Sequence, residues 1–421
     1  MSTDKISGTL QTQMRAAALD APIGVIVHHK AGVMSARAVA AAGAQVTYTY
    51  KFLPATAMRV PPAAIQALSQ DPTVDFIWPD LPVHTWLDQS VPHINVPQVW
   101  NLGIHGEGMK IGVVDTGVDP THPDFAGRIA AKTSFVGGDG TDDNGHGTHV
   151  CSIAAGSGAA SGGKYRGVAP AASLYVAKVL DANGSGATSG VMAGVEWAVD
   201  QGVQVINLSL GSDGACDGTD ALSTLCDQAV QQHGILVCAA AGNAGPSAGS
   251  VGSPGCARWV MTIGAADDSD AIANFSSRGP TADGRIKPDI VFPGVNIVAA
   301  QAAGTSLGPV VAPHYIRLSG TSMATPHATG STALLLQAKP GLTPNQVKWA
   351  LMTSAVNLNQ PANSQGSGRA DVFAAYQKAT SGTVPDLPNP PVPGDGGGGG
   401  GGGTTPPPGC WEQIKQMLGI G

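Results

Sequence analysis

Three segments of the chain each place a reactive side chain beside glycines at the end of an apolar run. They are GVVDTGVD with Asp115, DDNGHGTHV with His146, and SGTSMATPHATG with Ser322. Taken singly, each residue has a structural explanation: an Asp at a strand end caps a turn, a His is often a satisfied core imidazole, and a Ser ahead of an apolar helix is an N-cap. Together they supply a carboxylate, a base and a hydroxyl nucleophile, the three groups that acyl transfer by serine requires.

These residue types suit acyl transfer for a chemical reason. A serine hydroxyl is a poor nucleophile at neutral pH and needs an adjacent base to take its proton. The imidazole then becomes positive, and a buried carboxylate fixes its tautomer and stabilises its charge. His149, one turn after His146, also forms an H-x-x-H pair, but the Glu and the third ligand of a zinc protease are missing from this segment.

The segments Asp-Thr-Gly, His-Gly-Thr-His and Gly-Thr-Ser-Met-Ala-Thr-Pro-His, in this order, resemble the signature segments of the subtilisin-like serine proteases, or subtilases. The resemblance covers about residues 88–380 and implies a serine endopeptidase that cleaves peptide bonds through an acyl-enzyme. It further implies that Ser322 is the nucleophile, His146 the general base and acid, and Asp115 the group that orients the imidazole.

The same resemblance implies an oxyanion hole and a substrate site. The side-chain amide of Asn243, in AAAGNAG, is expected to stabilise the oxyanion together with the backbone N–H of the nucleophile. Ser209, Leu210 and Gly211 are expected to pair with an extended peptide. Gly252, in SVGSPG, matches the floor of the primary pocket, which predicts a broad specificity with preference for large apolar or aromatic residues before the scissile bond.

The elements that must position these residues alternate along the chain from Met109 onward. The runs MKIGVVDTG, SLYVAKVL, VQVINLSLG, ILVCAAAGN and WVMTIGAA are near-continuous apolar stretches, typical of strands buried on both faces. An amphipathic stretch at 189–200 predicts a helix between two of them. The pattern predicts an α/β fold with a mainly parallel sheet, and the resemblance implies the three-layer subtilisin-like fold for residues 88–380.

A separate module is predicted at residues 21–87, after an extension at 1–20. Its pattern indicates a small α+β domain, with strands at 25–29, 45–53, 57–60 and 73–79 and helices at 35–44 and 61–70. The module resembles the propeptide of the family, an intramolecular chaperone and inhibitor. We therefore expect a zymogen that cleaves itself between about His84 and Asp88.

The carboxyl-terminal part has the composition of a linker followed by a short tail. Residues 381–409 are rich in Pro and Gly and include an unbroken glycine run at 396–403. In the tail, residues 410–421, one helical stripe is formed by Trp411, Ile414, Met417 and Leu418. A helix this short is marginal alone, so it either docks on a surface or frays.

Composition narrows the range of partners. The 421-residue chain has a net charge of −7 and no Lys/Arg cluster, which argues against nucleic acid or an anionic membrane surface as a partner. No run of about eighteen apolar residues occurs, so we expect no membrane span. The expected partners of this monomer are protein or peptide substrates and its own propeptide as inhibitor.

Localisation and cysteine pairing are linked questions. The first twenty residues show no signal peptide, which favours the cytoplasm. Enzymes of the resembled kind with an inhibitory propeptide are exported, and we therefore expect an extracellular protein, for which a disulfide would be in keeping.

Cys216 and Cys226 flank a short polar segment, and the sequence leaves open whether they bridge each other or Cys256. Cys238 is expected to be a buried core thiol.

Calcium is where the chain departs from the family that it resembles. No cofactor is expected for catalysis. Asp124, in HPDF, matches a carboxylate that binds structural calcium in many subtilisins, but the stretch GSGAASGGKYRG lacks the Asn-rich loop that completes that site. Two other acidic groups offer oxygen ligands and serve equally well as turn and cap residues. They are Asp139, Asp142 and Asp143, and Asp217 with Asp220.

Two other function classes have weaker support. An esterase of the α/β-hydrolase kind needs G-x-S-x-G at a strand-to-helix elbow, and the matches at 245–249 and 304–308 do not lead into helical stretches. A catalytically inactive binding module that docks through the Trp411 tail would be expected to have lost a catalytic residue. Asp115, His146, Asn243 and Ser322 are all present.

Overall fold

The computed structural model describes residues 5–7, 10–11, 14–15, 21–30, 44–49, 55–79, 89–212 and 214–390. The chain divides into two compact units, Met1–His84 and Thr85–Gly421. The expected self-cleavage segment between His84 and Asp88, the tail at 410–421, and all of the predicted helix over 35–44 except Ala44 lie outside the described residues.

The smaller unit is built on a four-stranded antiparallel sheet in the order β2-β3-β1-β4. Its strands are β1 (Ile23–His29), β2 (Gln45–Thr49), β3 (Ala55–Val60) and β4 (Val74–Pro79). Side chains of β1 alternate between buried and partly exposed, as expected for a sheet with one covered face. Helix α3 (Pro62–Ser69) starts at a proline and packs Ile65 and Leu68 into the core on that face. The predicted strands and the helix at 61–70 are therefore confirmed where they are described.

The larger unit contains a seven-stranded parallel sheet in the order β11-β10-β9-β8-β5-β7-β6. The strands are β5 (Lys110–Asp115), β6 (Ile129–Ser134), β7 (Ser173–Lys178), β8 (Val205–Leu208), β9 (Leu236–Ala240), β10 (Met261–Ala266) and β11 (Ile290–Pro293). Every residue of β8, β9 and β10 is buried, which explains their near-continuous apolar sequences. The predicted α/β fold with a parallel sheet is confirmed.

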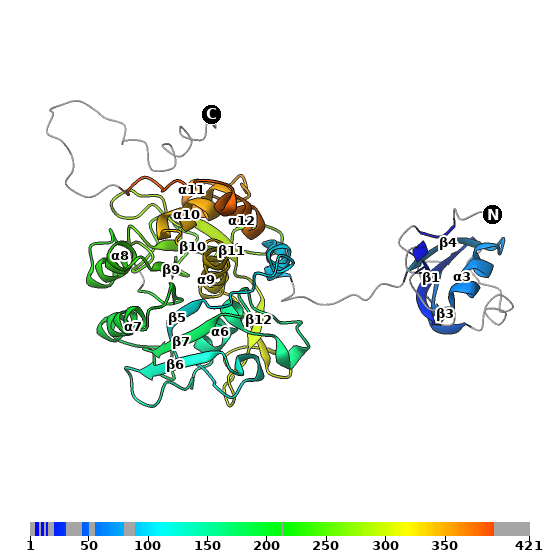
Figure 1. Ribbon diagram of the computed structural model, residues 1–421, viewed down its shortest axis with the longest axis horizontal. Helices are drawn as coiled ribbons and strands as arrows, with labels where there is room; N and C mark the ends of the chain where they lie inside the picture. Colours follow the sequence, from blue (N-terminus) through cyan, green and yellow to red (C-terminus); the bar gives the residue numbers. More distant parts are fainter. Residues whose placement is uncertain are drawn as a thin grey trace, which may run out of the picture. The chain divides into compact units, whose positions relative to one another are not determined.

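Helices cover both faces of this sheet and make three layers (Figure 1). On one face lie α7 (Thr188–Asp200) and α8 (Ala221–His233), which share a core with β5, β7, β8 and β9. On the other face lie α6 (His146–Ala155) and the central α9 (Thr321–Ala338), which packs across β8 to β11. The outer helices are α4 (Ser90–His93), α5 (Val96–Trp100), α10 (Pro344–Thr353), α11 (Ala362–Gln365) and α12 (Val372–Thr380).

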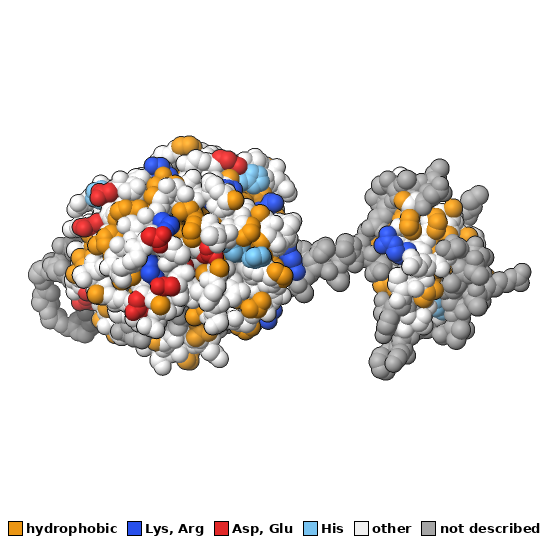
Figure 2. Space-filling view, turned by 90° about the horizontal axis from the view of Figure 1, so that it is seen from below, with side chains coloured by type: hydrophobic (Ala, Val, Ile, Leu, Met, Phe, Trp, Pro, Cys, Tyr) orange, Lys and Arg blue, Asp and Glu red, His pale blue; other side chains and the backbone are white. Residues whose placement is uncertain are grey.

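Some elements were not predicted. A three-stranded antiparallel sheet is formed by β12 (Ile297–Ala300), β14 (Tyr315–Leu318) and β13 (Val310–Ala312). Strands β6 and β11 of the central sheet and two short 3-10 turns, η1 (Pro123–Phe125) and η2 (Ala159–Ser161), were not predicted either. Among the described helices none is long and apolar enough to cross a membrane. On the face of the larger unit seen in Figure 2, acidic and basic side chains are interspersed.

The structure resolves the cysteine question. Cys216 is bridged to Cys256, and Cys226 is a buried free thiol, so the alternative of a Cys216 to Cys226 bridge is wrong. Cys226 lies on α8, where its side chain packs into the core between the helix and the sheet, away from the polar loop. Cys238 is a buried core thiol as expected, and burial raises its pKa to about 12.

Candidate active site

Asp115 and His146 form the centre of the site. Asp115 is the last residue of β5, at the carboxyl edge of the parallel sheet, and its side chain is fully buried. Its Oδ1 accepts hydrogen bonds from His146 Nδ1 at 2.7 Å and from the Thr116 N–H at 2.7 Å. The carboxylate therefore fixes the orientation of the imidazole and leaves Nε2 as the other functional nitrogen.

His146 is the first residue of α6 and follows Gly145, which adopts a φ of 108° that favours glycine. Burial by itself lowers the pKa of the imidazole. The charge of Asp115 and its hydrogen bond act in the opposite direction and outweigh burial, so the pKa of His146 is raised. A raised pKa makes the neutral imidazole a stronger base, so it accepts the proton of a serine more readily than an unperturbed imidazole does.

A second buried carboxylate, Asp142, links the segment of Asp115 to the segment of His146 through hydrogen bonds. It accepts hydrogen bonds from Thr116 Oγ1 at 2.9 Å, from the Gly145 N–H at 2.8 Å, and from the N–H and hydroxyl of Thr148 at 2.8 and 2.6 Å. These bonds join the end of β5 to the start of α6. The sequence analysis named Asp142 only as a candidate calcium ligand. Its position four residues before His146 could have indicated that it supports the site.

Ser322 is the second residue of α9, and its side chain is tied to the segment after β8. Its hydroxyl donates to the carbonyl oxygen of Ser209 at 3.0 Å, and the hydroxyl of Ser209 donates to the carbonyl oxygen of Ser322 at 2.8 Å. In the described part of the chain no hydrogen bond joins Ser322 to His146. The structure thus brings Asp115 and His146 into contact, whereas the Ser322 hydroxyl is bonded to a different acceptor. Catalytic hydrogen bonds are often not formed in sites without substrate.

Asn243 follows β9 and lies beside the start of α9. Its Oδ1 accepts from the Thr321 N–H at 2.9 Å and from the Thr321 hydroxyl at 3.0 Å. Because the oxygen is held in this way, the amide nitrogen is the free donor of the side chain. A Cβ placed on Gly320 would lie 3.5 Å from Asn243 Nδ2 and 3.6 Å from the Ser322 N–H nitrogen. Two donors therefore border the same small space.

A cleft of about 820 Å³ adjoins the site and is lined by His146, Ser209, Leu210 and Gly211. Among the described residues, no backbone hydrogen bond is formed by Leu210 or Gly211, which follow β8. The next backbone bond is at Ser212, whose N–H donates to the Ser253 carbonyl at 2.8 Å. The backbones of Leu210 and Gly211 are therefore open to a further strand.

Gly252 does not line this cleft, although its neighbour Ser253 does. A Cβ at Gly252 would overlap the carbonyl oxygen of Ser212, so glycine is needed for the close approach of two backbones. Its place as the floor of a pocket stays a prediction.

The candidate calcium ligands have hydrogen-bond or ion-pair partners within the protein. Asp124 is fully buried, and its oxygens accept from the Tyr315 hydroxyl at 2.9 and 3.0 Å and from the Ala160 N–H at 2.9 Å. The other candidates are turn, cap or ion-pair residues, as the alternative explanation held: Asp139 pairs with Lys132, Asp143 with Lys178, Asp217 bonds Thr219, and Asp220 caps α8.

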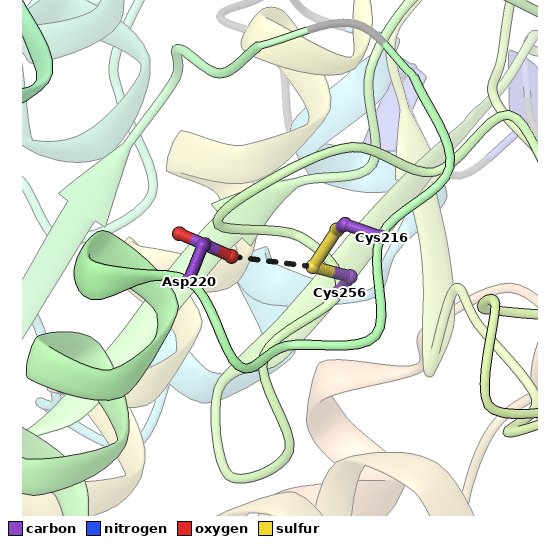
Figure 3. A group of neighbouring side chains, drawn as sticks. All are labelled: Cys216, Asp220 and Cys256. Carbon is purple, nitrogen blue, oxygen red and sulfur yellow. Dashed lines mark hydrogen bonds between the residues drawn. A yellow bond between two sulfur atoms is a disulfide. The ribbon is translucent and has the colours of Figure 1, made fainter.

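A grouping with metal-ligand distances among the described residues is Cys216, Asp220 and Cys256 (Figure 3). Its two sulfurs are joined in the disulfide and so are not thiolate ligands. This grouping therefore does not fit a calcium ion, which takes oxygen ligands.

His149 belongs to the core and not to the site. It is fully buried, donates from Nε2 to the Ile297 carbonyl at 3.2 Å, and burial lowers its pKa to about 3. The metal interpretation of the H-x-x-H pair has no support in this geometry.

Comparison with known proteins agrees with the geometry. A model of the subtilase family of peptidases matches residues 106–368. The chain is similar to the serine protease AprX of Bacillus subtilis (strain 168), with 39% identity over 316 residues, 69% of this chain and 71% of the relative. It is similar to subtilisin E of the same strain, with 37% identity over 344 residues, 80% of this chain and 84% of the relative. A solved cold-adapted subtilisin-like serine proteinase matches with 34% identity and a TM-score of 0.51, over 63% of this chain and 88% of that one.

Proposed function

The chain belongs to the subtilase family of serine proteases, and from this premise we propose that it is an endopeptidase with Ser322 as nucleophile, His146 as base and Asp115 as the orienting carboxylate. The observation that carries the proposal is the 2.7 Å hydrogen bond from His146 Nδ1 to the buried Asp115, at the edge of a peptide-sized cleft. A hydrogen-bonded imidazole and carboxylate beside a serine are the parts that serine acyl transfer needs.

The reaction proceeds in two halves. The Ser322 hydroxyl turns from the Ser209 carbonyl towards His146 Nε2, loses its proton to that nitrogen, and its oxygen attacks the substrate carbonyl carbon. Asp115 stabilises the imidazolium, which then gives the proton to the leaving amine as the peptide bond breaks. In the second half His146 takes a proton from water, the resulting hydroxide attacks the acyl-enzyme, and the proton returns to Ser322.

The oxyanion lies in the space bordered by Asn243 Nδ2 and the Ser322 N–H. Thr321 supports this role because it holds Asn243 Oδ1 with two hydrogen bonds and so fixes which way the amide points. A donor held in place before the reaction needs no reorganisation as charge develops on the substrate oxygen.

Substrate binds as an extended strand along Leu210 and Gly211. Main-chain pairing is independent of side chains, so it gives a broad specificity, and preference comes from the walls of the cleft. Leu180, Val191 and Leu222 are among those walls and favour large apolar groups. We keep the preference for large apolar residues before the scissile bond as part of the proposal.

The smaller unit acts as a propeptide that assists folding and inhibits the enzyme until self-cleavage between about His84 and Asp88. The sheet of the larger unit pairs strands that are far apart in sequence, and such topologies fold slowly, so a template would help. Sequencing the amino terminus of the mature enzyme tests this; a terminus outside 84–88, or full activity with the unit still attached, would contradict it.

We also propose that the enzyme is extracellular and monomeric and needs no cofactor for catalysis. The Cys216 to Cys256 disulfide supports export, because such bonds persist in oxidising compartments. Intact-mass measurement of culture medium against cell lysate tests the location, and finding the mature enzyme only in the lysate would refute it.

The central test uses a chromogenic peptide and a serine-directed fluorophosphonate. The enzyme should hydrolyse the peptide, lose activity in proportion to labelling, and carry the label on Ser322. Ser322→Ala should abolish both hydrolysis and labelling, whereas Ser247→Ala, in a G-x-S-x-G match of the esterase alternative, should change neither. Hydrolysis that survives labelling or the Ser322 change would remove the proposed mechanism.

A further inference from the structure

We propose that Asp220 gives the cleft a preference for a substrate residue with a cationic head and an aliphatic stem, that is, lysine or arginine, at one position before the scissile bond. This inference rests on the proposed peptidase function and deepens it. It adds a charge-selective position to a cleft whose other walls are apolar or neutral.

Asp220 lines the same cleft as His146 and Ser209. Among the described residues that line it, Asp220 is the one carboxylate, and no lysine or arginine is present. A single unbalanced charge in a partly enclosed cleft attracts the opposite charge and repels its own sign.

One oxygen of Asp220 is already used and the other is available. Oδ1 caps α8 by accepting from the Ser223 N–H at 3.0 Å and also accepts from the Ser253 hydroxyl at 2.7 Å. Oδ2 lies 4.0 Å from the sulfur of Cys256, which has no proton to donate because it is in the disulfide (Figure 3). The carboxylate is thus held in place by two donors while Oδ2 keeps its capacity to accept.

Asp220 carries its charge at working pH. Burial raises its pKa, but the hydrogen bonds from Ser223 and Ser253 outweigh burial and leave the pKa lowered. In the described part of the chain, no lysine or arginine forms an ion pair with Asp220; the ion pairs of Arg258 and Arg285 found there are with Asp283.

The wall that carries Asp220 is rigid. The Cys216 to Cys256 disulfide joins the loop before α8 to the loop after Gly252. The Ser212 N–H donates to the Ser253 carbonyl at 2.8 Å and ties the same two loops at a second point. A charge on a fixed wall selects between substrates, since the wall does not move to meet an uncharged side chain.

The neighbouring wall suits the stem of a long cationic side chain. Leu210, Ala221 and Leu222 line the cleft beside Asp220. Lysine and arginine bury their methylene stems on apolar surface and keep the charged end at a polar partner. An arginine head would also form a charge-assisted hydrogen bond to Oδ2, which is stronger than a bond between neutral groups.

The test compares peptides that carry arginine or its uncharged isostere citrulline at each of the four positions before the scissile bond. At one position the mature wild-type enzyme should prefer arginine over citrulline by roughly tenfold in kcat/KM. Asp220→Asn should bring this ratio close to one and leave the thermal midpoint unchanged, because Asn caps a helix as well as Asp does.

Two matched variants complete the test. Asp217→Asn removes a charge from the same loop at a residue that does not line the cleft, and the arginine preference should persist. Asp213 lies outside the described part of the chain, between Ser212 and Gly214, which both line the cleft. Asp213→Asn therefore tests whether its charge carries the preference instead, and the preference should persist.

Three outcomes overturn the inference while leaving the enzyme a peptidase: no arginine preference at any position, a preference that survives Asp220→Asn, or one lost instead in Asp213→Asn. Absence of hydrolysis of every peptide would instead overturn the proposed function, and this inference with it.

Discussion

The hydroxyl of Tyr315 donates to the carboxylate of Asp124 across 191 positions of sequence, at 2.9 and 3.0 Å from its two oxygens. Both side chains are fully buried, and the bond ties the antiparallel sheet of β14 to the η1 turn. A buried carboxylate needs hydrogen-bond donors or a cation to be stable. Here the phenol and the Ala160 N–H serve as the donors, in the position where the resemblance implied calcium.

Removing this hydroxyl should destabilise the larger unit. Tyr315→Phe keeps the ring and leaves Asp124 with the Ala160 N–H alone, so we expect a loss of about 2 to 3 kcal/mol in the free energy of unfolding. Urea unfolding followed by tryptophan fluorescence measures this, in the Ser322→Ala background so that self-cleavage does not interfere.

Tyr376→Phe is the matched control for that change, because the Tyr376 ring is partly exposed and stacks on Phe373. It should cost less than about 0.5 kcal/mol. Addition of a chelator to the wild-type chain should leave its midpoint unchanged. A chelator effect as large as that of Tyr315→Phe would show that a metal, and not the phenol, supports Asp124.

Five strands of the central sheet, β5 and β7 to β10, were predictable because they are largely buried and therefore have apolar sequences. Strand β11 is also buried but was not predicted, because it is only four residues long. Edge strand β6 has no fully buried residue and contains Lys132, and β13 is only three residues long, so neither carries a clear period. Elements of the smaller unit were predictable because the side chains of β1 alternate between buried and partly exposed and because α3 begins at a proline.

The site was predictable to the level of its motifs and not of its bonds. Asp115 and His146 stand in short segments with recognisable residues, and the resemblance implied that they meet. The exchange of hydrogen bonds between Ser209 and Ser322, or the contact of Asp220 with the cleft, joins residues whose sequence separation carries no pattern. Such contacts follow from tertiary packing alone.

Gly320→Ala should reduce catalysis without loss of stability. The added methyl would sit 3.5 Å from Asn243 Nδ2 and 3.6 Å from the Ser322 nitrogen, distances of ordinary contact, so the fold tolerates it. It would occupy the space in which we place the oxyanion, so kcat should fall by roughly 100-fold, the size of effect known for loss of an oxyanion donor in subtilisin itself.

The comparison variant for Gly320→Ala is Asn243→Ala, which should lower kcat to a similar extent with KM little changed. Peptide hydrolysis and thermal unfolding are measured together. Full activity in Gly320→Ala would place the oxyanion elsewhere.

The acid limb of the pH profile should report on His146. The imidazole must be neutral to accept the Ser322 proton, and the net effect of burial, the Asp115 charge and their hydrogen bond is a pKa raised above 6.5. The value of kcat/KM should therefore fall as the pH decreases through the pKa of His146, which lies above 6.5. Asp115→Asn should move this limb to lower pH and reduce kcat by about 10⁴, as the equivalent change does in trypsin.

Asp139→Asn provides the control for the pH profile, because Asp139 is an exposed partner of Lys132 in the same region. Its acid limb should match that of the wild type. A wild-type limb below 6.5, or an equal displacement in both variants, would contradict the assigned role of Asp115.

The disulfide should stabilise the larger unit through the loop that it closes. Cys216 and Cys256 are separated by 40 positions, and the chain-entropy model gives at most about 4 kcal/mol for a loop of this size. Cys216→Ala with Cys256→Ala should lower the free energy of unfolding by a large part of that amount and weaken substrate selection, because the loop before α8 lines the cleft. Cys226→Ala, which removes a buried free thiol, should cost only about 1 kcal/mol and leave selectivity intact. Equal losses in the two variants, or a peptide map with Cys226 in the bridge, would contradict this assignment.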